Sequence, residues 1–333
     1  MLTAITDNPD AAPYRDLTPD RVLDAVDSLG LHADGRILAL NSYENRVYQI
    51  GIDDAAPLVA KFYRPGRWPD AAILEEHDFT LELAAAEIPV VPPLAFAGVT
   101  LHEHQGFRFA LFPRRGGRWP ELDNPDNLAW LGRFLGRIHA VGAVRPFRHR
   151  PLLDIDSFGV QSHRYLLDNG FIPDYLQPAW DSVVDDLLGR VRAAFARAGQ
   201  AASIRLHGDC HPGNILWTDA GPHFVDFDDC RPGPAVQDLW MLISGSRARM
   251  TAQLAEVHDG YNEFCDFDPR QLHLIEALRS LRLLHYSAWL ARRWDDPAFP
   301  RSFPWFNTPR YWEEQILALR EQSALLDEPP LAV

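Results

Sequence analysis

The amino-acid sequence predicts an α+β fold in which a small β-rich part comes first and a larger, mainly helical part follows. Short runs of β-branched and aromatic residues, bounded by turn residues, dominate the first third of the chain. Apolar residues recur at helical spacing through most of the remainder. The stretch "PRRGGRW" at residues 113–119 separates these two patterns and is the best candidate for a boundary.

The N-terminal part is predicted to contain one helix and three strands after a loose leader at residues 1–16. The helix runs from Thr18, a typical N-cap residue, to Gly30, a typical C-cap residue. The runs "RILAL", "RVYQIGI" and "PLVAKFY" follow, and their length and turn-bounded spacing predict antiparallel strands. Lys61 lies in the third of these strands.

A second helix is predicted in "WPDAAILEEHDFTLELAAAEIPV". Glu76, Phe79 and Leu83 are spaced i, i+3 and i+7, so Glu76 is expected on the apolar stripe of this helix. Glu75 points more nearly outward and is expected to be a solvated charge. The run "LHEHQGFRFALF" then predicts two strands around a turn at residues 105–106.

These patterns divide the chain into an N-terminal part at residues 1–112, a hinge at 113–119 and a mainly helical part at 120–333. One exception interrupts the helical part, because "NILW" and "HFVDF" read as two strands joined by the turn "TDAGP". Helices are predicted at about residues 127–142, 177–198, 236–263, 270–294 and 310–325.

Composition excludes several classes of protein. The chain has 333 residues, is 47% hydrophobic and carries a formal net charge of −14, which disfavours nonspecific binding to nucleic acid or to anionic membranes. It has three cysteines, which give no disulfide framework and suit a reducing cytosol. The N-terminus does not resemble a secretory signal, and no apolar run is long enough to span a membrane. We therefore expect a cytoplasmic location.

Lys61 is the single lysine among 32 lysine and arginine residues. An isolated lysine in an arginine-rich chain can be a chance survivor. It can also mark a position that needs a compact ammonium, where a planar guanidinium does not fit. The role of the residues near Lys61 distinguishes between these two possibilities.

The stretch "RLHGDCHPGNILW" at residues 205–217 concentrates polar side chains between two apolar ends. Asp209 and Asn214 lie five residues apart in a loop that leads into a strand. Asp226 follows Asn214 by twelve residues and ends the partner strand. The start of one strand of a hairpin faces the end of the other, so Asn214 and Asp226 are expected to converge, with Asp209 beside them.

Phosphoryl transfer requires this set of groups. A hard Mg²⁺ ion binds carboxylate and amide oxygens, and a further carboxylate orients the acceptor hydroxyl and accepts its proton. A cation held by a glutamate must neutralise the phosphates of the donor. Lys61 and Glu76 match this pair in their order and their setting, which gives a local reason for the single lysine.

These residues also carry a resemblance. "LHGDCHPGNILW" followed by "VDFDD" is similar to the catalytic and metal-binding signature of the aminoglycoside phosphotransferase and choline kinase superfamily. "LNSYENRVYQ", "VAKFYRPGRW", "ILEEH", "GPAVQDLWMLI" and "RRWDDPAFPRSFPW" resemble, more narrowly, the bacterial stress response kinase A family. The resemblance covers essentially the whole chain, from about residue 15 to "EPPL" near the end.

The resemblance implies the bilobal protein-kinase-like fold, with a small antiparallel sheet in a nucleotide-binding N-lobe and a larger helical C-lobe that holds the catalytic loop and the acceptor site. It implies an ATP- and Mg²⁺-dependent serine/threonine protein kinase that acts in a bacterial stress response. We expect this kinase to phosphorylate itself and protein substrates, and to be a monomer.

Site roles follow from the same resemblance, residue by residue. Asp209 is expected to be the proton acceptor. Asn214 and Asp226 are expected to bind Mg²⁺, and Asp226 counts as catalytic together with Asp209. Lys61, steadied by Glu76, is expected to contact the ATP phosphates.

Two further positions complete the expected site. Ser42 lies in the loop that is expected to cover the nucleotide, but this loop, "NSYENR", lacks the glycines that are usual in kinases. Ser42 could equally be an ordinary turn residue. Asp238, in "GPAVQDLW", is expected to support the catalytic loop from below.

A zinc site is a weaker interpretation of the stretch around Asp209. The spacing of His207, Cys210 and His211 matches no closed structural zinc site, so His207 is expected to be a hydrogen-bonded structural residue and Cys210 a packed side chain. A small-molecule kinase acting on an aminoglycoside, choline or homoserine would share the same chemistry and stays open as an alternative. A pseudokinase scaffold is disfavoured by the intact motif residues, and a metal-dependent hydrolase by its ligand count.

Overall fold

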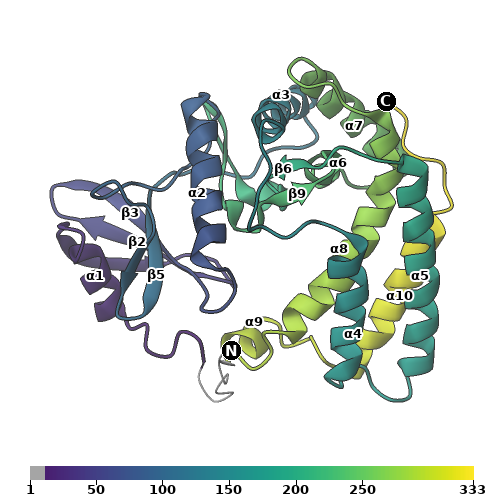
Figure 1. Ribbon diagram of the computed structural model, residues 1–333, viewed down its shortest axis with the longest axis horizontal. Coiled ribbons are helices and arrows are strands. Elements are labelled where there is room, and N and C mark those ends of the chain that lie inside the picture. The colour runs from purple at the N-terminus through teal and green to yellow at the C-terminus, as the bar shows by residue number, and fades with distance from the viewer. Residues whose placement is uncertain (1–11) are drawn as a thin grey trace. The chain divides into compact units, whose positions relative to one another are not determined.

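The structure, a computed structural model, describes residues 12–333 and divides the chain into two compact units (Figure 1). Unit 1 consists of Met1–Asp70, Pro93–Arg114 and Leu290–Phe306. Unit 2 consists of Ala71–Pro92, Arg115–Trp289 and Asn307–Val333. Most of the predicted loose leader lies outside the described residues. Within its described part, Tyr14 is buried, and its single hydroxyl proton is shared between the carbonyl oxygens of Glu44 and Phe62, each 3.2 Å away.

Unit 1 contains a five-stranded antiparallel sheet, which confirms the predicted strands. Thr18 caps the helix that precedes the sheet by accepting the N–H of Arg21. Apolar residues of this helix, among them Val22 and Val26, share a core with Ile50 of the sheet. The helix is α1 (Pro19–Asp27), and the strands, in the order in which they pair, are β1 (Ala33–Ala39), β2 (Arg46–Ile52), β3 (Ala55–Phe62), β5 (Phe107–Pro113) and β4 (His102–His104).

Unit 2 is mainly helical, so the α+β fold is confirmed. α3 packs along α7, and α5 packs along α10 (Figure 1). One large apolar cluster joins most of these helices to two small sheets. The helices are α2 (Asp70–Ala85), α3 (Pro125–Gly142), α4 (Gln161–Asp168), α5 (Gln177–Ala198), α6 (Val236–Trp240), α7 (Arg247–Asn262), α8 (Ile275–Ala291) and α10 (Pro309–Leu325).

The single helix predicted over 236–263 is wrong, because the chain forms the two helices α6 and α7 there. Gly245 between them has a φ of 100°, a conformation that other residues rarely adopt. Ser246 then caps α7 by accepting the N–H of Arg249. The glycine and the serine together end one helix and begin the next.

The two small sheets of unit 2 flank the loop that holds the predicted site residues Asp209 and Asn214. One pairs β6 (Ile204–Leu206) with β9 (Arg231–Gly233), and the other is the hairpin of β7 (Ile215–Thr218) and β8 (Gly221–Phe224). The hairpin confirms the predicted exception within the helical part. In residues 12–333 no helix combines the length and the apolar character needed to cross a membrane.

The two units divide the chain differently from the predicted parts 1–112 and 120–333. Residues 71–92 belong to unit 2, since Phe79 and Leu83 of α2 lie in its apolar cluster. The segment Leu290–Phe306, which contains α9 (Ala298–Ser302), belongs to unit 1 although it comes late in the chain. Tertiary contacts rather than chain order therefore set the composition of each unit.

Candidate active site

The β7–β8 hairpin brings Asn214 and Asp226 to the same end of two paired strands. Ile215 pairs with Phe224, and one residue further the N–H of Val225 donates to the carbonyl of Asn214 at 3.0 Å. Asp226 follows directly. The register therefore produces the convergence that the sequence predicts for this pair.

Asp226 has an unusual backbone conformation. Its φ is 59° and its ψ is 64°, in the left-handed region that non-glycine residues seldom occupy. Such conformations cost about 1–3 kcal/mol and tend to occur at functional sites. A glycine would relieve this cost, so an aspartate here indicates that its carboxylate is needed.

Asp209 lies beside this pair and is partly buried. The side-chain amide of Asn214 donates to the Asp209 carbonyl at 2.9 Å and faces its Oδ2 at 3.5 Å. Nε2 of His211 also lies 3.5 Å from Oδ2, while Nη1 of Arg282 donates to Oδ1 at 2.7 Å. Asp209, Asn214 and Asp226 therefore come together in unit 2.

The loop that carries Asp209 is anchored by a buried carboxylate. Asp238 accepts the backbone N–H of His207 at 2.8 Å and that of Gly208 at 2.9 Å. It also accepts a hydrogen bond from Nε2 of His139 at 3.0 Å. Nδ1 of the same histidine is hydrogen-bonded to the hydroxyl of Tyr261 at 3.0 Å. The predicted support of the loop by Asp238 is therefore confirmed.

Gly208 cannot be replaced in this loop. Its φ is +84°, and a Cβ atom at this position would lie 2.3 Å from the carbonyl oxygen of Asp229. The close approach of Gly208 to Asp229 brings the loop with Asp209 against the segment that follows Asp226.

His207 and Cys210 are structural residues, as predicted. Nε2 of His207 bonds the Val225 carbonyl at 3.0 Å, and its Nδ1 accepts the N–H of Asp209. Cys210 is fully buried, and burial raises the pKa of its thiol well above the usual value. No group of three or more His, Cys, Asp or Glu side chains within residues 12–333 is placed to hold a metal ion.

Glu76 lies on the buried stripe of α2, as predicted, and meets an arginine that the sequence did not single out. Nη2 of Arg150 donates to Glu76 at 2.9 Å, and the two side chains are 0% and 4% exposed. The same guanidinium donates to the carbonyls of Ala72 and Asp228. Burial opposes the charged form of Arg150, but nearby anionic groups outweigh it and raise the pKa of the guanidinium.

Arg150 therefore ties α2 to the chain just beyond Asp226. Ala72 and Glu76 belong to the first turns of the helix, and Asp228 lies two residues after the predicted metal ligand. The three acceptors sit on two segments far apart in sequence, and one planar guanidinium reaches all of them.

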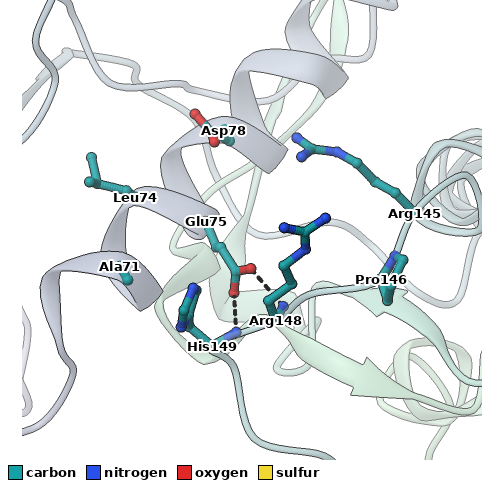
Figure 2. Close-up of a pocket in the computed structure, with 8 residues that line it drawn as sticks. All are labelled: Ala71, Leu74, Glu75, Asp78, Arg145, Pro146, Arg148 and His149. Atoms are coloured by element: carbon teal, nitrogen blue, oxygen red, sulfur yellow. Dashed lines mark hydrogen bonds between the residues drawn. The ribbon is translucent and has the colours of Figure 1, made fainter.

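The prediction that Glu75 is a solvated charge is wrong. Its carboxylate accepts the backbone N–H groups of Arg148 and His149 at 2.6 and 2.8 Å, at the edge of a pocket of about 330 Å³ between α2 and residues 145–149 (Figure 2). Glu75 thus holds the loop that leads into Arg150. The same contacts form the edge of the pocket.

Lys61 and Ser42 lie in unit 1. Lys61 is 6% exposed on β3, where it pairs with Val47 and Ala110 of the adjacent strands. Its Nζ lies 5.1 Å from the centroid of the Tyr63 ring, at a cation–π distance. The burial of this ammonium is inconsistent with a lysine that survives by chance on an exposed strand.

The loop with Ser42, residues 40–45, is held by the late segment Leu290–Phe306 of the same unit. Glu44 is 9% exposed and pairs with Arg64 at 2.8 Å and with Arg293. Arg64 also donates to Asp296 at 2.7 Å. The Tyr43 ring lies 4.8 Å from that of Phe303. This brace, formed by Arg293, Asp296 and Phe303 with their partners, fixes a loop that has no glycine.

The donor set at the hairpin fits Mg²⁺ better than a softer metal. Asp226 offers a carboxylate and Asn214 an amide oxygen, and hard cations prefer such ligands. The amide nitrogen of Asn214 is engaged by the Asp209 carbonyl, so the orientation of the amide is fixed with its oxygen on the other side. Asn214 and Asp226 would hold the ion if it binds here.

Similarity to known proteins shows the family to which this chain belongs. Residues 36–275 match the family model described as "Phosphotransferase enzyme family". The chain is 47% identical over 324 residues to "Stress response kinase A" of Escherichia coli (strain K12), and the match covers 97% of this chain and 98% of that protein. The chain is a member of this family of phosphotransferases. Another family member, "Serine/threonine protein kinase RdoA" of Salmonella typhimurium (strain LT2), is 46% identical with the same coverage.

Solved structures of more distant phosphotransferases show the same fold. An amicoumacin kinase in complex with AMP-PNP, Ca²⁺ and Ami superposes with a TM-score of 0.71 at 18% identity, over 94% of this chain and 95% of that one. A microcompartment-associated aminopropanol kinase superposes with a TM-score of 0.64 at 18% identity, over 88% and 91%. The kinase-like α+β fold of the family is therefore established for this member.

Sequence reasoning missed the contacts of Arg150 and Arg282 in unit 2 and those of the segment 290–306 in unit 1. All of them join residues that are far apart in the sequence. The run "RRWDDPAFP" contributed to the resemblance, but nothing in it indicates a contact with residues 40–45. Arg150 and Arg282 are two of the chain's many arginines, and no local pattern distinguishes them.

Proposed function

We propose that this phosphotransferase is an ATP- and Mg²⁺-dependent serine/threonine protein kinase that acts in the cytoplasm as part of a bacterial stress response. The observation that carries the proposal is the assembly of Asp209, Asn214 and Asp226 at one end of the hairpin, on a loop anchored by Asp238. The name of the Salmonella relative supports a protein acceptor.

Each residue has a defined task in the proposed reaction. Asp209 orients the acceptor hydroxyl and takes its proton. The acceptor oxygen bonds to the γ-phosphorus while the bond from that phosphorus to the β,γ-bridging oxygen breaks, so ADP leaves. Asn214 and Asp226 would hold Mg²⁺, which would supply positive charge to neutralise the phosphates. Lys61 contacts those phosphates, Glu76 steadies Lys61, and the loop with Ser42 covers the nucleotide.

A labelling experiment tests the acceptor. The purified chain is incubated with γ-labelled ATP and Mg²⁺, first alone, then with a generic protein, then with a panel of amino alcohols and aminoglycosides. We expect label on serine or threonine of the chain itself and of the added protein. Self-labelling within one monomer proceeds at a rate per molecule that does not depend on concentration, whereas transfer from one monomer to another speeds up as the concentration rises. Label on a small alcohol and never on protein would establish the small-molecule alternative instead.

Two isosteric variants test the division of roles. Asp226→Asn should weaken Mg²⁺-dependent ATP binding, and asparagine tolerates the left-handed backbone at this position, so folding should be preserved. Asp209→Asn should leave ATP binding largely intact and reduce turnover by about 10²-fold or more. Equal losses of ATP affinity in the two variants would contradict the assignment of the metal to Asp226 and of the proton to Asp209.

A further inference from the structure

Arg282 of α8 places a guanidinium directly against the Asp209 carboxylate. Its Nη1 donates to Oδ1 at 2.7 Å, and its side chain is 43% exposed. The two residues are 73 positions apart in sequence, so the packing of α8 and not the catalytic loop brings this charge to the site. None of the roles described above requires an arginine here.

The two oxygens of Asp209 are in different situations. Oδ1 accepts a short, charge-assisted hydrogen bond from Arg282. Oδ2 faces the Asn214 amide and Nε2 of His211 at 3.5 Å each, beyond the usual range for a good hydrogen bond. Oδ2 is therefore the oxygen that can receive an acceptor hydroxyl, which must then bind beside the arginine.

Arg282 retains donors for a ligand. A guanidinium has five N–H groups, and within residues 12–333 Arg282 makes only the one hydrogen bond to Asp209. Nearly half of its side chain is exposed. A carboxylate or phosphate on an acceptor could therefore bind the remaining donors, whereas an ammonium in the same place would be repelled.

The side chains that contact the Asp209 carboxylate are neutral or cationic. Arg282 carries a positive charge, Asn214 is an amide, and the imidazole of His211 carries no negative charge in either protonation state. A site built for a cationic amino alcohol would place carboxylates around the acceptor. Here the proton-accepting carboxylate is itself paired with an arginine.

We propose that Arg282 determines the charge class of the acceptor: a hydroxyl with a neighbouring anionic group is preferred, and one with a neighbouring cation is rejected. The inference rests on the proposed role of Asp209 as the proton acceptor. A unit charge held about 4–6 Å from the guanidinium near the protein surface should change kcat/KM by roughly tenfold in either direction. An acidic segment around a serine or threonine is the acceptor that fits.

The test compares acceptors that differ only in charge. Three serine peptides carry neutral, aspartate or arginine residues on both sides of the serine, and glycerate and ethanolamine provide an anionic and a cationic small alcohol. Initial rates of ADP release and mass spectrometry of the product give kcat/KM for the wild type, Arg282→Gln and Arg282→Glu. Arg279→Gln is the matched control, since Arg279 lies one turn earlier on α8 and pairs with Glu276.

The wild type should prefer the acidic peptide over the basic one by about a hundredfold, the product of the two tenfold effects. Arg282→Gln should nearly abolish this ratio, Arg282→Glu should invert it, and Arg279→Gln should keep it. A purely structural role of Arg282 would lower all rates together and leave the ratio unchanged, which would overturn the inference. Transfer to small alcohols alone would refute the protein-kinase proposal, and the ratio of glycerate to ethanolamine would still decide the role of Arg282.

Discussion

Replacement of Arg150 by methionine should destabilise unit 2 and reduce phosphotransfer together. The guanidinium is 0% exposed and donates to three acceptors, Glu76 and the carbonyls of Ala72 and Asp228. Methionine fills much of the volume but supplies no donor. The variant therefore removes the connection between α2 and the segment after Asp226, while the packing changes little.

The size of the effect follows from the burial. A hydrogen bond to a charged group contributes about 1.5–3 kcal/mol, and loss of one partner of a buried ion pair costs about 3–5 kcal/mol. Because the three bonds share one side chain, we take about 3–5 kcal/mol for the whole substitution rather than a sum. At roughly 2 °C per kcal/mol for a chain of this size, the midpoint of thermal unfolding should fall by at least about 6 °C.

Urea unfolding followed by circular dichroism measures the free energy change, and ADP release measures turnover. Arg148→Met is the matched control, because Arg148 lies two residues away with an exposed side chain. Glu76→Gln combined with Arg150→Met should recover part of the lost stability, since no carboxylate is then left beside the missing guanidinium, but it should not recover turnover. A folding free energy within about 1 kcal/mol of the wild type, with turnover equal to that of Arg148→Met, would refute this account of Arg150.

Three further predictions use other parts of the molecule. Lys61→Arg should fold normally and lose at least about 10²-fold in turnover, because the longer, forked guanidinium cannot replace a compact ammonium; near-normal phosphotransfer would remove Lys61 from the mechanism. Asp296→Asn should loosen the brace and raise the KM for ATP severalfold with little change in kcat at saturating ATP, and the reverse pattern would count against the brace. Burial raises the pKa of the Cys210 thiol and raises that of Cys230 to about 12, so both carry little reactive thiolate at pH 8. Mass spectrometry after alkylation of the folded chain should find Cys265 alone modified, and early modification of Cys210 would contradict its burial.

The parts of the fold that could be predicted are those set by neighbouring residues. Thr18 marks the start of α1, and turn residues mark the ends of the strands in unit 1. The convergence of Asn214 and Asp226 also needs only the register of a short hairpin. In each case the determining interactions lie within about a dozen residues, so the sequence pattern contains them.

The remaining parts depend on contacts that no local pattern encodes. Arg150 meets Glu76 across 74 positions, and Arg64 meets Asp296 across 232. The position of Glu75 on its helix predicts a solvated charge, and only the tertiary structure shows the backbone N–H groups of residues 148–149 above it. The break before α7 does have a local signal, the "SGS" at residues 244–246. The helical periodicity on both sides of this signal is stronger, and it predicts one continuous helix.

The arginine-rich composition gains a physical explanation from these contacts. Arg150 spans three acceptors, and Arg205 likewise reaches the carbonyls of Val141 and Gly142 together with Glu82. A planar fork that bonds several fixed oxygens at once suits a structural anchor, and an ammonium on a flexible stem does not. The chain uses arginine for such anchors, whereas its one lysine, Lys61, occupies a buried position on strand β3. A compact charge that can adjust its position is what a moving phosphoryl group requires, and this favours a role for Lys61 with the substrate over a role in stability.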